Sequence, residues 1–148
     1  YAAQLVLALS RAAGAMGMIG GQSLDIGFEG PVTDLKTLTL LHRRKTGALI
    51  QVGLTMAAII GKATSVQRQS LETFGKHIGF AFQLADDLLD AEEDAAEDGP
   101  PSFVKLLGET ETSNAAKHAM KSALTAIEDF THNHALVELA HFTVQRQF

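Results

Sequence analysis

The long helical pattern between Ser65 and Asp98 limits the fold of this chain more than any other feature of its sequence. Apolar and polar residues recur there with the three- and four-residue spacing of an α-helix, and Gly99-Pro100-Pro101 ends the pattern. No segment of the chain shows convincing β-alternation. The low aromatic content of 6% and the presence of only three Pro residues agree with a helical protein. The sequence therefore predicts an all-α fold.

Five further helices are predicted around the long one. The first covers residues 2–19 and ends at the pair Gly20-Gly21, and the next is capped by Thr33 and runs to Arg44. The remaining helices cover residues 46–61, 113–132 and 135 to the end. With 148 residues, 46% hydrophobic content and no internal repeat or linker, residues 1–148 are expected to form a single all-α unit.

The start of the chain carries no sign of a targeting segment. Tyr1 opens a stretch that already has a helical composition, without the basic residues and apolar core of a signal peptide. The most apolar stretch, Ala48 to Ile60, is too short to span a bilayer and predicts a buried helix. The absence of Cys excludes disulfides and thiolate metal sites. We therefore expect a fragment of a longer, cytoplasmic protein without a membrane span.

The acidic residues are concentrated at the end of the long helix. The net charge is -5, and eight of the 17 acidic residues lie between positions 86 and 98, where there is no Lys or Arg. Such a concentration repels nucleic acid and attracts cations. The sequence therefore argues against a nucleic-acid-binding protein.

A stripe of polar side chains predicts a cation site on that helix. Residues three or four positions apart lie on one helical face, and such a face is formed here by Gln83, Asp86, Asp87, Asp90 and Asp94. Surface helices commonly carry a polar face, but they usually mix Lys with Glu and gain about 0.2–0.5 kcal/mol from each pair. Here like charges are stacked instead, and a divalent cation would offset their repulsion.

Oxygen donors without His or Cys are typical of a hard cation, either magnesium or calcium. A calcium-binding EF-hand that began at Asp90 would need Gly at its sixth position and Glu at its twelfth, and these positions hold Ala95 and Pro101. Magnesium is usually bound by one or two carboxylates together with substrate phosphates. The pattern therefore favours Mg²⁺ beside a phosphorylated substrate.

Three segments of this chain, taken in order, resemble motifs of the trans-isoprenyl (polyprenyl) diphosphate synthases. Residues 82–90, Phe-Gln-Leu-Ala-Asp-Asp-Leu-Leu-Asp, are similar to the second aspartate-rich motif of that family. Residues 20–25, Gly-Gly-Gln-Ser-Leu-Asp, resemble its Gly-Gly-Gln-x-x-Asp segment, and residues 45–50 resemble its Lys-Thr-Gly-Ala-Leu-Ile helix start. The resemblance covers nearly the whole chain and is greatest to bacterial farnesyl and geranylgeranyl diphosphate synthases, in their C-terminal half.

The resemblance implies a helical bundle of the isoprenoid-synthase type, usually a homodimer. It also implies head-to-tail condensation of isopentenyl diphosphate with an allylic prenyl diphosphate, giving farnesyl or geranylgeranyl diphosphate. Negative charge develops on the departing diphosphate, and magnesium ions held between two Asp-rich helices stabilise that charge.

The resemblance also assigns roles to individual residues. Lys45, Thr46 and Gln83 are expected to bind the substrate diphosphate, and together with Asp86 they form the expected catalytic group. The expected metal-binding residues are Asp86, Asp87 and Asp90, with Asp86 a direct ligand and Asp87 either a ligand or a support for one.

Other candidate residues keep two interpretations. Gln22 and Asp25 either close a turn after the first helix or serve the site. Two histidines near a predicted helix break are expected on the surface, His132 and His134. Three aromatic residues are expected in the helix-packing core rather than in a substrate pocket: Phe74, Phe80 and Phe82.

The chain departs from the family pattern in two ways. The first Asp-rich motif is not among these 148 residues, so we expect residues 1–148 alone to lack condensation activity. The family also has lysines after the second motif, whereas residues 95–104 contain none and Lys105 lies too far along to replace them. Two alternatives therefore remain, a non-catalytic subunit of a prenyl synthase and a terpene cyclase. The Lys45-Thr46-Gly47 segment argues against the cyclase, and the product length stays open.

Overall fold

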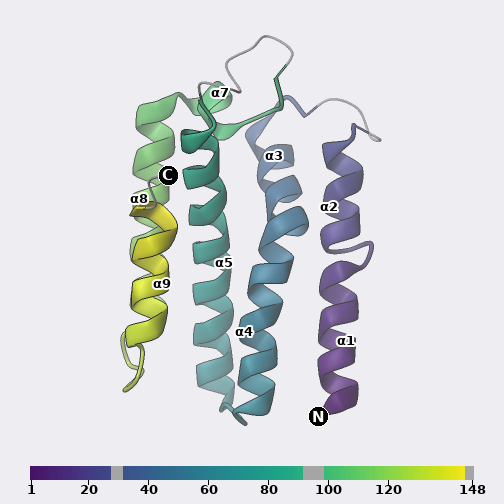
Figure 1. Cartoon of the computed structure of the whole chain (residues 1–148), viewed down its shortest axis with the longest axis vertical. Helices are drawn as coiled ribbons and strands as arrows, with labels where there is room; N and C mark the ends of the chain where they lie inside the picture. The colour runs from purple at the N-terminus through teal and green to yellow at the C-terminus, as the bar shows by residue number, and fades with distance from the viewer. Residues whose placement is uncertain (28–31, 92–98, 146–148) are drawn as a thin grey trace.

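The computed structural model describes residues 1–27, 32–91 and 99–145, and within these ranges it contains helices and no strand, which confirms the predicted all-α class. Figure 1 shows the helices lying side by side, with α4 between α1 and α5, and with α8 and α9 beyond α5. The helices are α1 (Ala2–Ala13), α2 (Met18–Asp25), α3 (Leu35–His42), the π-helix η1 (Arg43–Gly47), α4 (Ala48–Ile60), α5 (Ser65–Leu89), α7 (Phe103–Leu107), α8 (Glu109–Ala126) and α9 (His134–Gln145).

The long helix α5 begins at a capping box. The Thr64 hydroxyl accepts from the Gln67 backbone N–H, and the Gln67 side chain accepts from the Thr64 N–H. The helix ends at Leu89, with Asp90 as its C-cap, and not near Asp98 as predicted. Residues 92–98, which include the predicted stripe member Asp94, lie outside the described part of the chain.

The core forms where α5 packs against α8 and α9. Small residues on α8 let the two long helices approach each other, while large side chains on α5 fill the space between them. The buried cluster contains Phe74, Ile78, Ala81, Ala119, Ala123, Ile127 and Ala140. Phe74 is therefore a core residue, as predicted. A second cluster connects the C-terminal part of α5 with α3, α7 and α8 through Leu38, Leu84, Phe103 and Ala116.

The first helical segment breaks earlier than predicted. Gly20 and Gly21 lie inside α2, and the break falls between Ala13 and Met18. Gly21 is required for packing, because a Cβ atom built on it would lie 2.2 Å from the backbone nitrogen of Lys45. The weak helix propensity of Gly is overridden here by this close approach of α2 to η1, so the prediction of a helix end at Gly20-Gly21 was wrong.

The predicted helices 33–44 and 46–61 form one continuous rod made of α3, η1 and α4. Its N-cap is Asp34, not Thr33, since the Asp34 carboxylate accepts from the backbone N–H groups of Lys36 and Thr37. These bonds, above all the one from the Thr37 backbone, lower the pKa of Asp34. The joint between α3 and α4 is a π-helix, a rare form that is frequent at functional sites.

The C-terminal helices also shift from their predicted bounds. Residues 103–107 form the short helix α7, capped by Ser102, where a turn was expected. Gly108 adopts φ +82°, a value that suits Gly, and this sharp change of direction lets α8 begin at Glu109, before the predicted start. The last helix begins at His134, next to the predicted Ala135, while residues 146–148 lie outside the described part.

One face of the helical layer is apolar and open. Helix α1 has no buried residue, and Leu49 and Ile60 on α4 are 38% and 63% exposed, although Ala48–Ile60 was predicted to be buried. By length and composition alone the segment Ala2–Asp25 could cross a membrane, since an 18-residue window in it has a mean hydropathy of 1.4, but core helices and signal sequences have the same length and composition. In the structure a break divides this segment into α1 and α2.

Candidate active site

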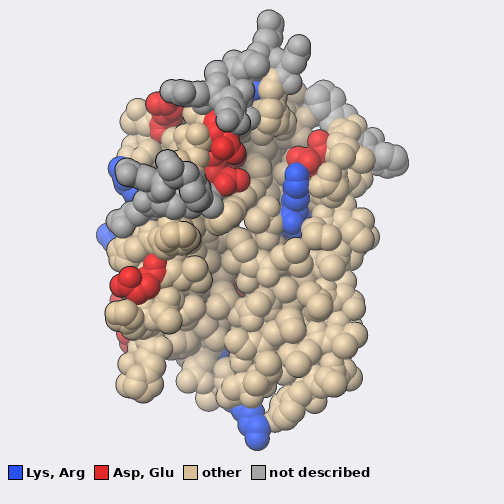
Figure 2. All heavy atoms as spheres, viewed as in Figure 1, with Lys and Arg blue, Asp and Glu red and all other residues tan. Residues whose placement is uncertain are grey.

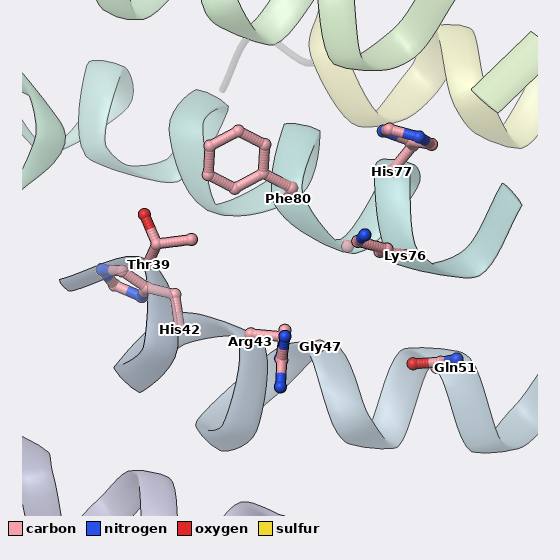
Figure 3. Close-up of a pocket in the computed structure, with 9 residues that line it drawn as sticks. Thr39, His42, Arg43, Gly47, Gln51, Lys76, His77 and Phe80 are labelled. Atoms are coloured by element: carbon pink, nitrogen blue, oxygen red, sulfur yellow. The ribbon is translucent and has the colours of Figure 1, made fainter. Parts of the chain in front are cut away.

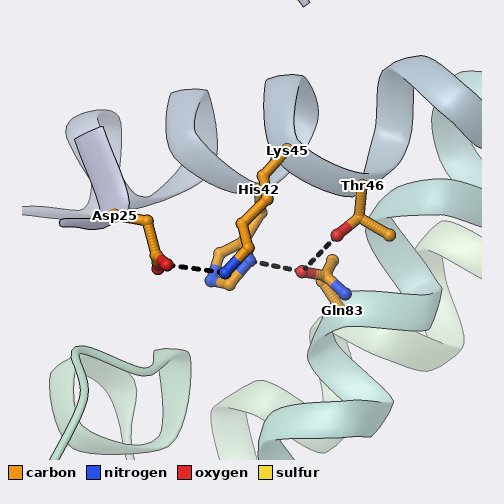
Figure 4. A network of polar contacts seen from close by, with 5 residues as sticks. All are labelled: Asp25, His42, Lys45, Thr46 and Gln83. Atoms are coloured by element: carbon orange, nitrogen blue, oxygen red, sulfur yellow. Dashed lines mark hydrogen bonds and ion pairs between the residues drawn. The ribbon is translucent and has the colours of Figure 1, made fainter. Parts of the chain in front are cut away.

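Four of the predicted site residues come from elements that meet near the upper end of the bundle in Figure 1. Lys45 and Thr46 lie on η1, Gln83 and Asp86 on the last turns of α5, and η1 packs against α5. Figure 4 shows Lys45, Thr46 and Gln83 with two further residues, Asp25 from α2 and His42 from α3, joined by polar contacts. The structure therefore brings segments that are far apart in sequence into two polar groups, Asp25 with Lys45, and Gln83 with His42 and Thr46.

Lys45 is paired with Asp25 across the approach of α2 to η1. The Lys45 Nζ atom donates to Asp25 Oδ2 over 2.6 Å, and the two side chains are 37% and 30% exposed. An ion pair with this exposure is weak because water screens it. Asp25 is the last residue of α2 and holds the ammonium group in place, so it does more than close the turn after that helix. Gln22, on the same helix, is exposed.

Gln83 is 6% exposed, and its side-chain oxygen is held from η1 and α3. Oε1 accepts a hydrogen bond from Thr46 Oγ1 at 3.4 Å and lies within hydrogen-bonding distance of His42 Nδ1. An amide oxygen accepts two hydrogen bonds, so these two groups use its capacity. The amide nitrogen of Gln83 is the atom that remains to donate to a ligand.

His42 is the residue that the sequence analysis missed. Burial lowers its pKa, although the contact with Gln83 and the nearby charge of Asp25 act in the opposite direction. The ring stacks on Phe103 with centroids 5.3 Å apart, and Phe103 meets Phe80 edge-on at 5.4 Å. A usable signal was present: His42 lies four residues before Thr46, a spacing that puts both on one side of a helical segment.

The three aspartates do not share one open face. Asp86 is half-buried, Asp87 is 9% exposed and Asp90 is exposed beyond the end of α5. Asp87 turns towards α7, where its Oδ2 accepts from the Phe103 backbone N–H at 2.5 Å. That N–H belongs to the first turn of α7, where N–H groups have no partner within the helix. Asp87 therefore caps α7 from a neighbouring helix.

Removal of the Asp87 carboxylate is expected to destabilise the protein. In Asp87→Ala the buried Phe103 N–H loses its acceptor, which costs about 1–3 kcal/mol of unfolding free energy. Asp87→Asn is expected to fall between Ala and wild type, since its amide oxygen can still accept. Urea denaturation of the intact protein measures the difference, with the exposed Asp90→Ala as the matched control. Equal midpoints for Asp87→Ala and Asp90→Ala would contradict this role.

The remaining candidates fall into surface and packing groups. His132 and His134 are exposed, as predicted. Phe80 and Phe82 are half-buried rather than fully packed in the core. Phe82 borders a cavity of about 230 Å³ between α4, α5 and α9, with Ile50 and Ile78 on its walls. The prediction that these two rings belong to the core is therefore only partly met.

A second cavity opens next to His42, between α3–η1–α4 and α5 (Figure 3). Its volume is about 230 Å³, and the figure shows Phe80 and His42 at one end and Lys76 and His77 further along α5. Burial is the main cause of the lowered pKa of His77. The cavity is lined by Thr39, His42, Arg43, Gly47, Gln51, Lys76, His77, Gly79 and Phe80.

Acidic and basic side chains lie on one surface of the molecule. Figure 2 shows acidic side chains over the upper end of α5, an adjoining acidic and basic group towards α2, and a wide uncharged area below. In the described ranges no three His, Asp or Glu side chains are arranged to hold a metal ion together. The oxygen donors of Asp86 and Asp90 fit a hard cation, which takes its other ligands from water or phosphate.

The fold and the site define a helical protein that combines a lysine, a hydroxyl and an amide with adjacent carboxylates. Residues 3–128 match the model of the family described as polyprenyl synthetase. The chain belongs to this family, which confirms the resemblance seen in its motifs.

Relatives in sequence include farnesyl diphosphate synthases and geranylgeranyl pyrophosphate synthases. The farnesyl diphosphate synthase of Haemophilus influenzae is 36% identical, over 97% of this chain and 52% of the relative. That of Geobacillus stearothermophilus is 34% identical, over 85% of this chain and 41% of the relative. The chain thus spans about half the length, or somewhat less, of these curated relatives.

Solved structures show the same arrangement of helices. An FPP/GFPP synthase from Zymomonas mobilis superimposes with a TM-score of 0.86 at 36% identity, over 95% of this chain and 50% of that one. A geranyltransferase from Helicobacter pylori, in complex with magnesium and isoprenyl diphosphate, gives 0.74 at 31% identity, over 93% and 48%.

Proposed function

We propose that the protein containing this chain is a short-chain trans-prenyl diphosphate synthase. It condenses isopentenyl diphosphate with an allylic prenyl diphosphate and forms farnesyl or geranylgeranyl diphosphate. The observation that carries the proposal is the meeting of Lys45, Thr46 and Gln83 beside Asp86, at the junction of η1 and α5. The names of the similar synthases support the substrate class.

Each residue has a role that its position allows. Lys45 gives up its exposed, screened contact with Asp25 and places its charge on a diphosphate oxygen. The amide NH₂ group of Gln83 donates to the same diphosphate, while its oxygen stays bound on the protein side. The Thr46 hydroxyl donates to that oxygen and so holds the Gln83 side chain, which binds the diphosphate, next to η1.

Asp86 and Asp90 are the residues we propose to hold magnesium in this half of the protein. Their carboxylates, one half-buried and one exposed, lie at the end of α5. Bound magnesium would supply a Lewis acid that stabilises charge on the departing diphosphate. The complex of the Helicobacter pylori geranyltransferase with magnesium supports this choice of ion. Asp87 has a supporting role, because its carboxylate is engaged with α7.

The setting of the reaction is part of the same proposal. We expect a cytoplasmic enzyme that works as a homodimer and binds no nucleic acid. The open apolar face of α1 and α4 is available for further protein contacts, such as those of a complete prenyl synthase bundle. Residues 1–148 alone are expected to show no condensation, since they contain only one group of aspartates for the metal ions.

The test is an assay of the intact protein with magnesium, isopentenyl diphosphate and allylic diphosphates of several lengths. A product one or more isoprene units longer than the allylic substrate supports the proposal, and its length identifies the enzyme. Hydrocarbon or alcohol products formed from the allylic substrate alone would indicate a cyclase. Activity that appears only after a second subunit is added would indicate a non-catalytic partner.

Within that assay, Asp86→Asn is expected to lower kcat by about 100-fold or more, because an electrostatic stabiliser of the leaving diphosphate is lost. Glu72→Gln is a matched control, since Glu72 is an exposed acid on the same helix. It is expected to leave kcat unchanged. Similar kcat values for Asp86→Asn and Glu72→Gln would contradict the role of Asp86.

A further inference from the structure

The contact between His42 and Gln83 has a direction that the surroundings determine. Gln83 Oε1 already accepts from the Thr46 hydroxyl, so the same oxygen faces His42 Nδ1. For these two atoms to bond, Nδ1 must carry the proton and donate it. The His42 ring is then either the neutral Nδ1–H tautomer or the doubly protonated form.

The other ring nitrogen decides between these two forms. Nε2 of His42 is buried and has no hydrogen-bond partner among the residues that the structure describes. An unpaired N–H in that place would be costlier than an unpaired lone pair, because buried N–H groups without acceptors are the rarer case. Burial also lowers the pKa of His42. The ring is therefore neutral, with its proton on Nδ1.

The same reasoning excludes the reversed amide. If the Gln83 NH₂ group faced His42, then Nδ1 would be the acceptor and the proton would lie on the buried, unpartnered Nε2. The Thr46 hydroxyl can accept as well as donate and would pair with either orientation, so the choice depends on Nε2 of His42. The orientation with Oε1 towards His42 is therefore preferred, because it leaves an unpaired lone pair and not an unpaired N–H on the buried Nε2.

We propose that His42 is a positioning residue, which acts with Thr46 to hold the Gln83 amide so that its NH₂ group faces the substrate diphosphate. This inference rests on the proposed function. A free Gln side chain could present either its oxygen or its nitrogen, and the oxygen would repel a diphosphate. Because His42 donates to the oxygen, the amide is already oriented with its NH₂ group towards the diphosphate site before the substrate binds.

The position of His42 is itself held from several sides. Phe103 of α7 stacks on the ring, and the backbone N–H of Phe103 is bound by Asp87 of α5. The charged groups that act on the ring are Asp25 of α2, Lys45 of η1 and Asp86 of α5, and their effects on its pKa have mixed signs. Packing therefore fixes the ring as a donor, and its neutral state follows from the buried, unpaired Nε2.

The kinetic test compares His42→Leu with His42→Asn in the full-length enzyme. Leu removes the donor and is expected to raise KM for the allylic diphosphate about 10-fold with little change in kcat, since the Gln83 contact is made before and during reaction. Asn keeps an N–H donor near the place of Nδ1 and is expected to restore KM to within about threefold. Equal KM values for Leu and Asn would overturn the proposal.

A double-mutant cycle separates positioning from general destabilisation. If His42 acts through Gln83, then His42→Leu added to Gln83→Ala causes no further rise in KM. A full additional 10-fold rise in the double variant would overturn the proposal. The conclusion depends only on the ratios of KM between the variants.

The tautomer provides a readout that does not depend on catalysis. Nitrogen NMR of the full-length wild type is expected to show His42 with a protonated Nδ1 and an unprotonated Nε2 at neutral pH. Protonation on Nε2 alone would overturn the inference, whatever the enzyme does. A wild type with the expected tautomer that condenses no allylic diphosphate would instead contradict the proposed function.

Discussion

Replacement of Lys45 by Gln in the intact protein is expected to lower kcat/KM for the allylic diphosphate by about 100-fold or more. Lys45 is the cation that the π-helix places beside Thr46 and Gln83. Among the described residues Lys45 forms one ion pair, with Asp25, and water already screens it, so the ammonium group can move to a diphosphate at little cost. Steady-state kinetics with the allylic substrate varied measure the loss.

The control for this prediction is Lys36→Gln. Lys36 is exposed in the first turns of α3, and only its backbone N–H takes part in the cap at Asp34. The two variants change net charge equally, so a general effect of charge on substrate encounter would appear in both. A loss of activity in Lys36→Gln as large as that in Lys45→Gln would show that no specific contact is involved.

Gly21→Ala is expected to lower the unfolding free energy by about 3 kcal/mol, at the upper end of the usual range for overpacking. The added methyl group would lie 2.2 Å from the nitrogen, 2.6 Å from Cα and 2.8 Å from Cβ of Lys45. Backbone atoms cannot rotate away, so α2 and η1 must separate. Because η1 also carries Lys45 and Thr46, the same variant is expected to raise KM for the allylic substrate.

Gly53→Ala is the matched comparison for Gly21→Ala. Gly53 also lies within a helix, but apart from the adjacent residues and the backbone of α4 itself no heavy atom lies within 4 Å of a Cβ built there. The substitution is expected to stabilise α4 by about 0.5–1 kcal/mol, the difference in helix propensity between Gly and Ala. Urea denaturation of both variants of the intact protein measures the contrast. Equal stability of the two variants would contradict the packing role of Gly21.

Gly20-Gly21 illustrates how far a local pattern can be trusted. Two adjacent Gly residues are a strong signal for a helix end, yet both lie within α2. Gly21 is needed because a side chain would not fit there. The residue that excludes the side chain lies on η1, more than 20 positions further along the chain. Local propensities do not contain such contacts.

The aspartates show a similar division. Their charge and spacing correctly placed an acidic group at the end of the long helix. Helical spacing predicted that they share one face, whereas Asp87 is buried against α7 and Asp90 lies beyond the last residue of α5. The burial of Asp87 depends on the packing of α7 against α5. The spacing of residues along one helix contains no information about that packing.

The sequence by itself determined the all-α class, the family and the residue types of the site, because helical periodicity and short motifs are local properties of the chain. Only the tertiary structure decided which atoms face one another. It pairs Lys45 with Asp25, engages Asp87 with α7, and brings His42 to Gln83, 41 positions away. Such pairings depend on how packed helices are rotated and offset, which is settled by the contacts of the whole bundle.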